Sequence, residues 1–219
     1  MKTILILVHS LILLVFSHKQ SVGQKTIDTK LKKQLDSVLE LDQHYRAIIM
    51  NPAKKDSFAK KLHLTTQQAD NTAMALSMHA DSANIIFVEK IIKEYGYPGK
   101  SLVGKPTDEA AWNVIQHSTK IHQYIGLIKE AANDGELSFK LYATMLDRDL
   151  LNQGKEQIYG TQIRSQKMKD GKMSIFVWPI QDAEKVNERR KKAGFDDTVE
   201  QNAKKFGVTY SVINMDDIK

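Results

Sequence analysis

Three expected helices each carry an ionisable residue on or beside the apolar stripe that should face the core. Asp42 interrupts the stripe of the first helix, His117 lies in that of the third, and Asp147 lies beside the leucines of the fourth. Burying an unpaired charge is costly, so such residues need polar partners. Arg46 lies one turn beyond Asp42, and Arg148 directly follows Asp147. We therefore expect the three side chains to converge on one polar cluster.

An imidazole beside a carboxylate is suited to proton transfer. We expect His117 to act as a general base or acid that Asp147 orients. A pair of acids for glycoside cleavage would have to be Asp42 and Asp147, and no spacing in the sequence supports that pair. A structural alternative uses the same residues in a buried hydrogen-bond network that fixes helix register, with an aspartate holding His117 in one tautomer.

A run of neutral polar residues follows the helix that carries Asp147. Gln157, Tyr159, Thr161 and Gln162 supply amides, a phenol and a hydroxyl that can line a pocket for sugars, amides or peptides. The alternative is the beginning of a hairpin strand. Alternation along a strand would place the first three on one face and Gln162 on the other, so not all of them can serve one site.

Several familiar chemistries lack their motifs. His117 and His122 are five residues apart and do not form the i, i+4 ligand pair of a helical zinc site. Ser118 is adjacent to His117, but adjacent helical residues point about 100° apart and form no dyad. The sequence has no P-loop, no G-x-G-x-x-G and no G-x-S-x-G. No cofactor or metal is therefore expected, and a metal site would require assembly from distant segments.

The elements that must position these residues are mostly helical. Apolar residues recur three and four apart over 31–49, which predicts an amphipathic helix that ends at the Asn-Pro pair beyond it. The lysine-rich stretch 51–65 is expected to be a loop or a weak helix. A second helix is expected around 85–92, a third and most regular one over 107–131, and a fourth over 137–152.

The only clear β signal lies after the fourth helix. Segments 158–166 and 172–178 flank Asp170 and Gly171, a pair that favours the turn of a two-stranded hairpin.

Two short helices are expected after the hairpin. Asp182 can cap one that ends at Ala193, and Asp197 with Glu200 resembles a capping box for the last. The expected fold class is mainly α with a minor β component (α+β minor), a helical bundle of about five to six helices with one β-hairpin after the fourth helix.

The first residues resemble a signal peptide. Lys2 precedes an almost unbroken apolar run over 4–16, which is shorter than the roughly 20 residues of a membrane span. Small residues at Ser21 and Gly23 suit cleavage after Gly23. An uncleaved anchor helix is the alternative. We expect a signal peptide at 1–23 and one mainly helical domain over 24–219, exported to a periplasm or out of the cell, with no stable membrane span after cleavage.

Composition excludes further classes. The 219 residues include no cysteine, which excludes disulfides, thiolate nucleophiles and cysteine zinc sites. Lysines and arginines number 32 against 26 acids, a formal net charge of +6, but they occur as short scattered clusters without interleaved aromatic residues. Such clusters are typical of solvated helix faces, so nucleic acid is not an expected partner.

Short motifs occur in a fixed order from about residue 36 to 200. Their residues are Asp42, Gln43, Arg46, Asp81, Asn84, Gly96, Tyr97, Pro98, Ser101, Val103, Gly104, Ala110, Ala111, Trp112, Gln116, His117, Gly135, Glu136, Leu146, Asp147, Arg148, Gly154, Gln157, Tyr159, Gly160, Thr161, Gln162, Asp182, Arg189, Arg190 and Gly194. In order and spacing these motifs resemble a bacterial family known as domain of unknown function 6624. The lysine-rich stretch from about 51 to 70 departs from the family's pattern. No activity is implied, because the family has no assigned function. The pattern includes the candidate residues found above and adds Gln116.

The leading functional expectation is an acid-base, hydrolase-like enzyme that acts on an envelope or nutrient-derived molecule. The alternative is a noncatalytic periplasmic or secreted module that binds a ligand or a protein, and the expected partner in either case is a small molecule, glycan or peptide. His117 and Asp147 are the catalytic candidates. The candidate binding residues are Asp42, Arg46, Gln116, Arg148, Gln157, Tyr159, Thr161 and Gln162.

Overall fold

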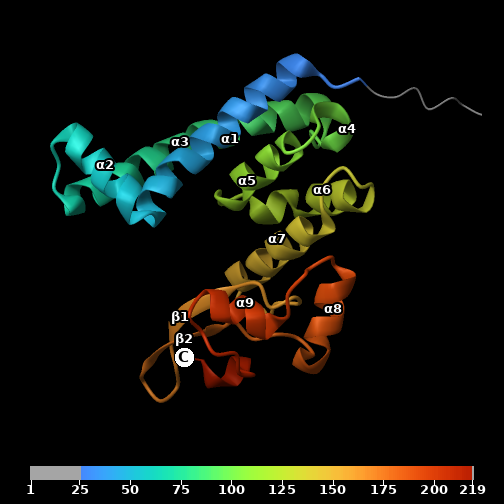
Figure 1. Cartoon of the computed structure of the whole chain (residues 1–219). Helices are drawn as coiled ribbons and strands as arrows, with labels where there is room; N and C mark the ends of the chain where they lie inside the picture. Colours follow the sequence, from blue (N-terminus) through green and yellow to red (C-terminus); the bar gives the residue numbers. More distant parts are fainter. Residues whose placement is uncertain (1–25, 219) are drawn as a thin grey trace, which may run out of the picture.

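The computed structural model describes residues 26–218, which form nine α-helices and one two-stranded antiparallel hairpin after α7 (Figure 1). The mainly helical class is confirmed, with more helices than the five or six expected. The expected signal peptide at 1–23 lies outside the described residues. Within residues 26–218, none of the helices combines the length and apolarity that a membrane crossing requires.

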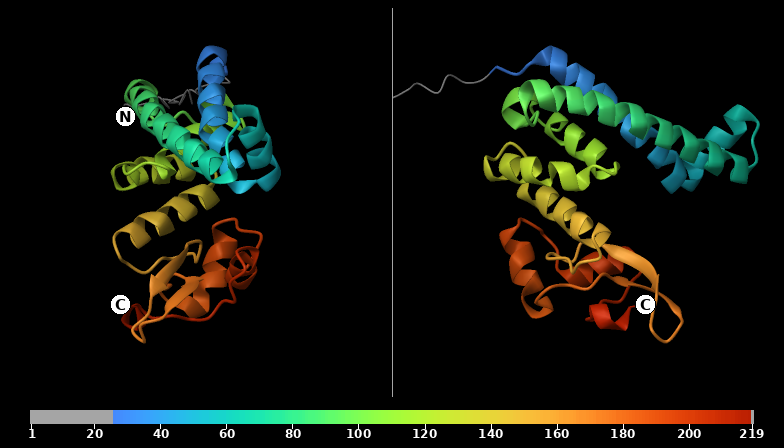
Figure 2. Two further views of the ribbon diagram at one scale, coloured as in Figure 1. Left: turned by 90° about the vertical axis from the view of Figure 1, so that its left-hand side faces the viewer. Right: turned by 180° about the vertical axis from the view of Figure 1, so that it is seen from behind.

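Helices α1 (Thr29–Met50), α2 (Pro52–Leu62) and α3 (Thr66–Tyr95) form an elongated unit. Figures 1 and 2 show α1 and α3 side by side, with α2 at their far end. The amphipathic stripe predicted over 31–49 is confirmed, because Leu31 and Leu35 of α1 are buried. They pack with Ile91 of α3 and with Val103.

The interpretation of 51–65 as a loop or weak helix understates α2. Pro52 occupies the first turn of α2, where no backbone N–H is needed, so it begins a helix as well as ending α1. Asn51 Oδ1 accepts from Lys54 N at 3.1 Å and caps α2. Helix α3 also begins far earlier than the expected 85–92, because Thr65 and Gln68 form a capping box at its start.

The prediction of one long helix over 107–131 is wrong, because the helix is interrupted at His117. A 3₁₀ turn at Thr107–Glu109 leads into α5 (Ala110–Gln116), and α6 (Ile121–Asn133) begins after a turn. Ser118 Oγ donates to Ile115 O at 2.8 Å, and Lys120 N donates to Ser118 Oγ at 3.1 Å. These local bonds replace the helical ladder and place His117, which is half-buried, at the C-terminal end of α5.

Helix α7 (Phe139–Asn152) joins the two parts of the molecule. One side packs against α6, and the shared core includes Val88 of α3, Ile115 of α5, Ile128 of α6 and Met145 of α7. Short helix α4 (Lys100–Val103) lies between α3 and α5 in the chain. This core fixes the ends of α5 and α7 relative to α1 and α3, which is what the site requires.

The C-terminal part is built on strands β1 (Ile163–Lys167) and β2 (Met173–Val177), paired from Ile163 with Val177 to Lys167 with Met173. The predicted hairpin is confirmed, but residues 157–162 precede its first strand. Helices α8 (Val186–Lys192) and α9 (Val199–Lys205) lie with it below α7, with α8 on the side away from the hairpin (Figures 1 and 2). They share with β2 a second hydrophobic cluster, which includes Val177, Val186 and Val199.

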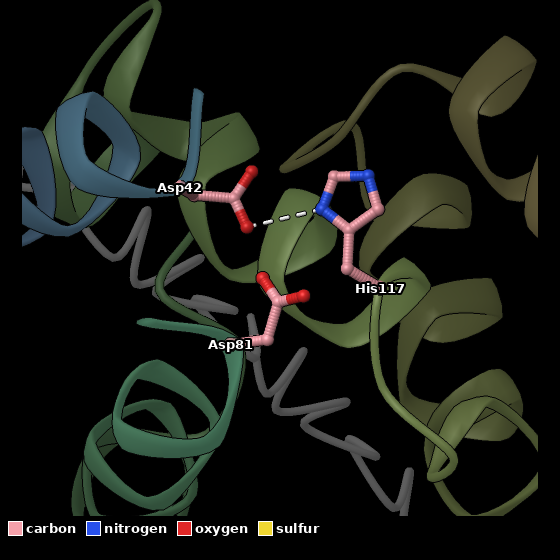
Figure 3. A group of neighbouring side chains, drawn as sticks. All are labelled: Asp42, Asp81 and His117. Atoms are coloured by element: carbon pink, nitrogen blue, oxygen red, sulfur yellow. Dashed lines mark hydrogen bonds and ion pairs between the residues drawn. The ribbon is translucent and has the colours of Figure 1, made fainter. Parts of the chain in front are cut away.

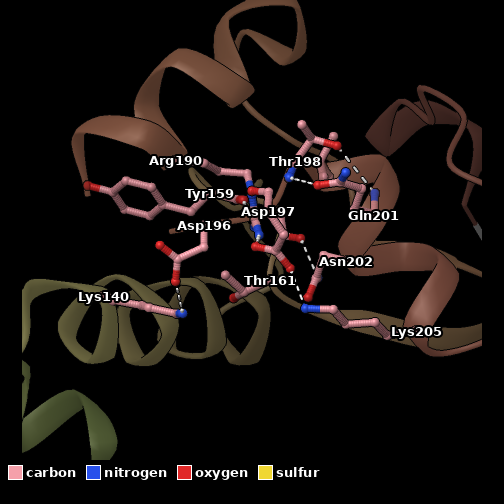
Figure 4. Close-up of polar contacts among 12 residues, drawn as sticks. Lys140, Tyr159, Thr161, Arg190, Asp196, Asp197, Thr198, Gln201, Asn202 and Lys205 are labelled. Carbon is pink, nitrogen blue, oxygen red and sulfur yellow. Dashed lines mark hydrogen bonds and ion pairs between the residues drawn. The ribbon is translucent and has the colours of Figure 1, made fainter. Parts of the chain in front are cut away.

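Both predicted caps in this part differ from the structure. Thr198 with Gln201 forms the capping box of α9 (Figure 4), whereas Asp197 forms ion pairs with Arg190 and Lys205. The side chain of Asp182 accepts no capping hydrogen bond, and a 3₁₀ turn precedes α8. Asp197 accepts charge-assisted hydrogen bonds from Arg190 and Lys205, which are stronger than bonds from neutral backbone N–H groups. The carboxylate of Asp182 lies 3.7 Å from Lys185 Nζ and from Arg189 Nη1.

Candidate functional site

The centre of the site is a pair of side chains from distant segments. Asp42 lies buried on α1, and His117 terminates α5. His117 Nδ1 lies 3.0 Å from Asp42 Oδ1 (Figure 3). Since a carboxylate accepts hydrogen bonds, this contact assigns the proton to Nδ1. Within the described residues Nε2 of His117 has no hydrogen-bond partner, so it is the ring nitrogen available for proton transfer.

Two further side chains hold Asp42. Gln43 Nε2 donates to Asp42 Oδ2 at 2.6 Å, and Arg46 Nε lies 3.7 Å from the same oxygen. Arg46 Nη2 also pairs with Asp81 Oδ1 of α3 at 2.5 Å. One guanidinium thus joins α1 to α3, and Asp81 lies close to the pair of Asp42 and His117 (Figure 3).

The environment of Asp42 favours its charged form. Burial acts to raise the pKa of Asp42, but the hydrogen bond and charge of His117, followed by Arg46 and Gln43, outweigh burial and hold that pKa below its ordinary value of 3.8. The carboxylate is therefore ionised at neutral pH. It can fix the imidazole ring and stabilise the imidazolium that forms when Nε2 takes up a proton.

This lowered pKa gives a testable pH dependence. A carboxylate whose folded pKa is depressed stabilises the fold above its unfolded pKa, and this stabilisation is lost as pH falls through the folded value. We expect the unfolding free energy of wild type minus that of Asp42→Asn to shrink as pH falls below about 5, where the unfolded carboxyl takes up its proton before the folded one does. Urea unfolding at a series of pH values measures this. Asp56→Asn, on the exposed side of α2, is the control, and a difference that grows as pH falls below about 5 would contradict the assignment.

Three side chains of the same cluster offer metal-ligand atoms. One ligand atom each from Asp42, Asp81 and His117 lie within 4.8 Å of one another. Two carboxylates and an imidazole are a donor set that divalent metals use, assembled here from distant segments. In this structure, however, the guanidinium of Arg46 pairs with both carboxylates and offsets one of their two negative charges. The expectation that the protein uses no metal or cofactor stays a prediction.

Asp147 has a different role from the one expected. It is fully buried on α7, and its carboxylate accepts from Ile158 N, Tyr159 N and Thr161 N at 2.8–3.2 Å and from Thr161 Oγ1 at 2.9 Å. Burial raises the pKa of Asp147, while these donors act in the opposite direction. The expected orientation of His117 by Asp147 is therefore wrong. The structure assigns that position to Asp42, and Asp147 fixes the 158–161 loop.

Most of the polar run after α7 also serves this loop. Gln157 is fully buried, its Nε2 donating to Trp178 O at 2.7 Å and its Oε1 accepting from Gln162 N at 2.8 Å. Tyr159 packs its ring near Phe195, and Tyr159 O accepts from Arg190 (Figure 4).

These contacts decide which members of the run reach the site. The alternating strand given above as the alternative for 157–162 does not form, because the segment is folded around Asp147. Gln157, Tyr159 and Thr161 accordingly do not line the cleft beside His117, whereas Gln162 does.

A cleft of about 470 Å³ opens beside His117. It unites five expected residues, Arg46, Gln116, His117, Arg148 and Gln162, with Asp42 behind His117. The sequence did not identify Ser118, Asn152 and Arg164 as polar residues of this cleft. Asp81 lies beside the pair of Asp42 and His117; it occurred among the family-like motifs but was not recognised as a site residue. The lining residues are Arg46, Gln116, His117, Ser118, Ile121, Arg148, Leu151, Asn152, Gln162, Ile163 and Arg164.

Comparison with known proteins agrees with the ordered motifs of the sequence. No curated protein and no solved structure matches the chain. A family model, described as a family of unknown function (DUF6624), matches residues 30–211. That match includes both the pair of Asp42 and His117 and the loop held by Asp147. The resemblance inferred from the motifs is confirmed, and the chain belongs to the DUF6624 family.

Proposed function

We propose that the protein is an exported enzyme that performs acid-base, hydrolase-like chemistry on a small envelope or nutrient-derived molecule. The observation that carries this proposal is the contact of His117 Nδ1 with the buried Asp42 at the wall of the cleft. A free Nε2 next to a cleft of this size is the arrangement that a general base requires. The signal-like first residues support export.

In the proposed reaction each group has one role. His117 Nε2 would take a proton from a nucleophilic water or hydroxyl and return it to the leaving group. Asp42 would keep the ring in the Nδ1–H tautomer and stabilise its cationic form. Gln116 and Gln162 offer neutral hydrogen-bond groups on the cleft wall for orienting a substrate.

Noncatalytic binding of a ligand or protein is the alternative. The neutral amide side chains of Gln116 and Gln162 in the cleft favour it, because they can hydrogen-bond a ligand without reacting with it. In that case His117 would be a contact residue and no product would form. A periplasmic or an extracellular location is compatible with both functions and does not distinguish the enzyme from the binding module.

The proposal is tested by incubating the purified protein with panels of small esters, amides and glycosides and detecting products by mass spectrometry. We expect Asp42→Asn to slow product formation at least tenfold, because the amide cannot stabilise an imidazolium by charge. Asp149→Asn is the matched control. It alters a second histidine–aspartate pair, in which His122 Nδ1 lies 3.1 Å from Asp149 Oδ2 outside the cleft. Equal rates for wild type and Asp42→Asn would contradict the catalytic role, and binding without any product would favour the alternative.

A further inference from the structure

Arg148 is a cation without a counterion in the described part of the chain. Its Nη1 donates to Gln116 O at 3.1 Å, and its Nε donates to Gln162 Oε1 at 3.4 Å. Both acceptors are neutral. Among residues 26–218, no carboxylate lies within ion-pair distance of the Arg148 guanidinium. Arg46 and Arg190, by contrast, each pair with an aspartate.

This unpaired charge is held where it should be costly. Arg148 is half-buried, and the cationic Arg46 lies near it. Burial, followed by the charge of Arg46, lowers the pKa of Arg148 from its ordinary value. A guanidinium nevertheless keeps its proton in proteins. A partly buried charge without a protein partner costs stability, so the retention of Arg148 beside the cleft favours an anionic ligand as its partner.

The position of Arg148 shows where that anion would lie. Its guanidinium lines the same cleft as His117, and Gln116 and Gln162 hold it from two sides. Arg164 of β1 also lines this cleft, 5.8 Å from the Trp178 ring centroid, and within the described chain it too has no carboxylate partner. The cleft therefore presents two uncompensated guanidinium groups.

The remaining wall limits the size and character of the ligand. Ile121, Leu151 and Ile163 supply apolar surface, and the volume of about 470 Å³ suits a small molecule. Guanidinium groups match carboxylate and phosphate oxygens geometrically, with two parallel hydrogen bonds.

We propose that the cleft binds a small molecule bearing an oxyanion, a carboxylate or a phosphate group, with Arg148 as its anchor and Arg164 as a second contact. This names the substrate class of the proposed function and rests on it for identifying the cleft as the substrate site. The anion would lie beside His117 Nε2, so that the anchored end of the substrate positions the rest for proton transfer.

Calorimetric titration of the full chain with inorganic phosphate and with acetate, at constant ionic strength in chloride, tests the proposal. We expect saturable binding of at least one anion at one site. Arg148→Gln should weaken this binding at least tenfold. Lys155→Gln removes an exposed positive charge outside the cleft and should change it less than about twofold. If phosphate binds more tightly than acetate, and Arg164→Gln also weakens phosphate binding, the ligand carries a phosphate group. If acetate binds more tightly than phosphate, the ligand carries a carboxylate.

Two further observations separate the possible failures. Saturable anion binding by wild type, with no product from any of the substrate panels, would leave the anion site intact and count against the catalytic role alone. The melting temperature of Arg148→Gln should equal or exceed that of wild type, because a charge without a counterion is removed. If that variant does not fold, Arg148→Lys keeps the charge but loses the planar fork, and it should still weaken binding. The proposal is overturned if the wild-type protein shows no saturable anion binding, or if the folded Arg148 variant binds the anion as tightly as wild type does.

Discussion

Replacing Asp147 by alanine is expected to lower the free energy of unfolding by about 3–5 kcal/mol. The substitution leaves the N–H groups of Ile158, Tyr159 and Thr161 without their acceptor, the fully buried carboxylate, in a partly buried loop. Each unsatisfied buried donor costs about 1–3 kcal/mol, partly recovered where water can enter. Asp147→Asn should show a smaller loss, because one oxygen remains to accept.

Urea unfolding of purified variants measures this effect. Asp149→Ala is the matched control, because Asp149 is also buried on α7, at 4% exposure against 0% for Asp147. Its partners are the side chains of His122 and Gln153, which are exposed and can turn to water. Its loss should be about 1 kcal/mol or less. Similar losses for Asp147→Ala and Asp149→Ala would contradict the role assigned to Asp147.

Replacing His117 by alanine is expected to lower kcat/KM about 10²–10⁴-fold towards any substrate that the wild-type protein turns over. The substitution removes the proposed proton-transfer group, but Asp42 keeps its contacts with Arg46 and Gln43. The melting temperature should therefore change little. A large kinetic effect with a small stability effect is what separates a catalytic residue from a structural one.

His122→Ala is the control for this kinetic experiment. It removes a histidine that also pairs with an aspartate, but its side chain is 77% exposed and lies outside the cleft. We expect its kcat/KM to match wild type. Comparable losses in both variants, or a His117→Ala protein that is mainly destabilised, would favour the structural network over the enzyme.

The helices were predictable wherever burial follows a local period. The stripes of α1 and α7 are visible in the sequence because each helix buries one continuous face. The break between α5 and α6 could not be predicted, because the apolar period continues in phase across it. What ends α5 is the hydroxyl of Ser118, which competes with the helical ladder through its bond to Ile115.

The candidate residues were found more reliably than their partners. Patterning shows that Asp42, His117 and Asp147 face the interior, but it contains no information on which helices adjoin. The structure places α1 against α5, so His117 meets Asp42, whereas Asp147 faces the loop that follows its own helix. Arg164 was missed because a solvent-exposed strand arginine gives no signal in a single sequence; only the tertiary structure places it at the cleft.

The most direct test of the central claim is the protonation state of the two His117 ring nitrogens, measured by nitrogen-15 NMR at a pH where the imidazole is neutral. The pair with Asp42 predicts a proton on Nδ1 and a bare Nε2 whose signal shifts when phosphate or acetate fills the cleft. Asp42→Asn should reduce the population of that tautomer. A proton on Nε2, or an Nε2 signal indifferent to Asp42 and to both anions, would contradict the account.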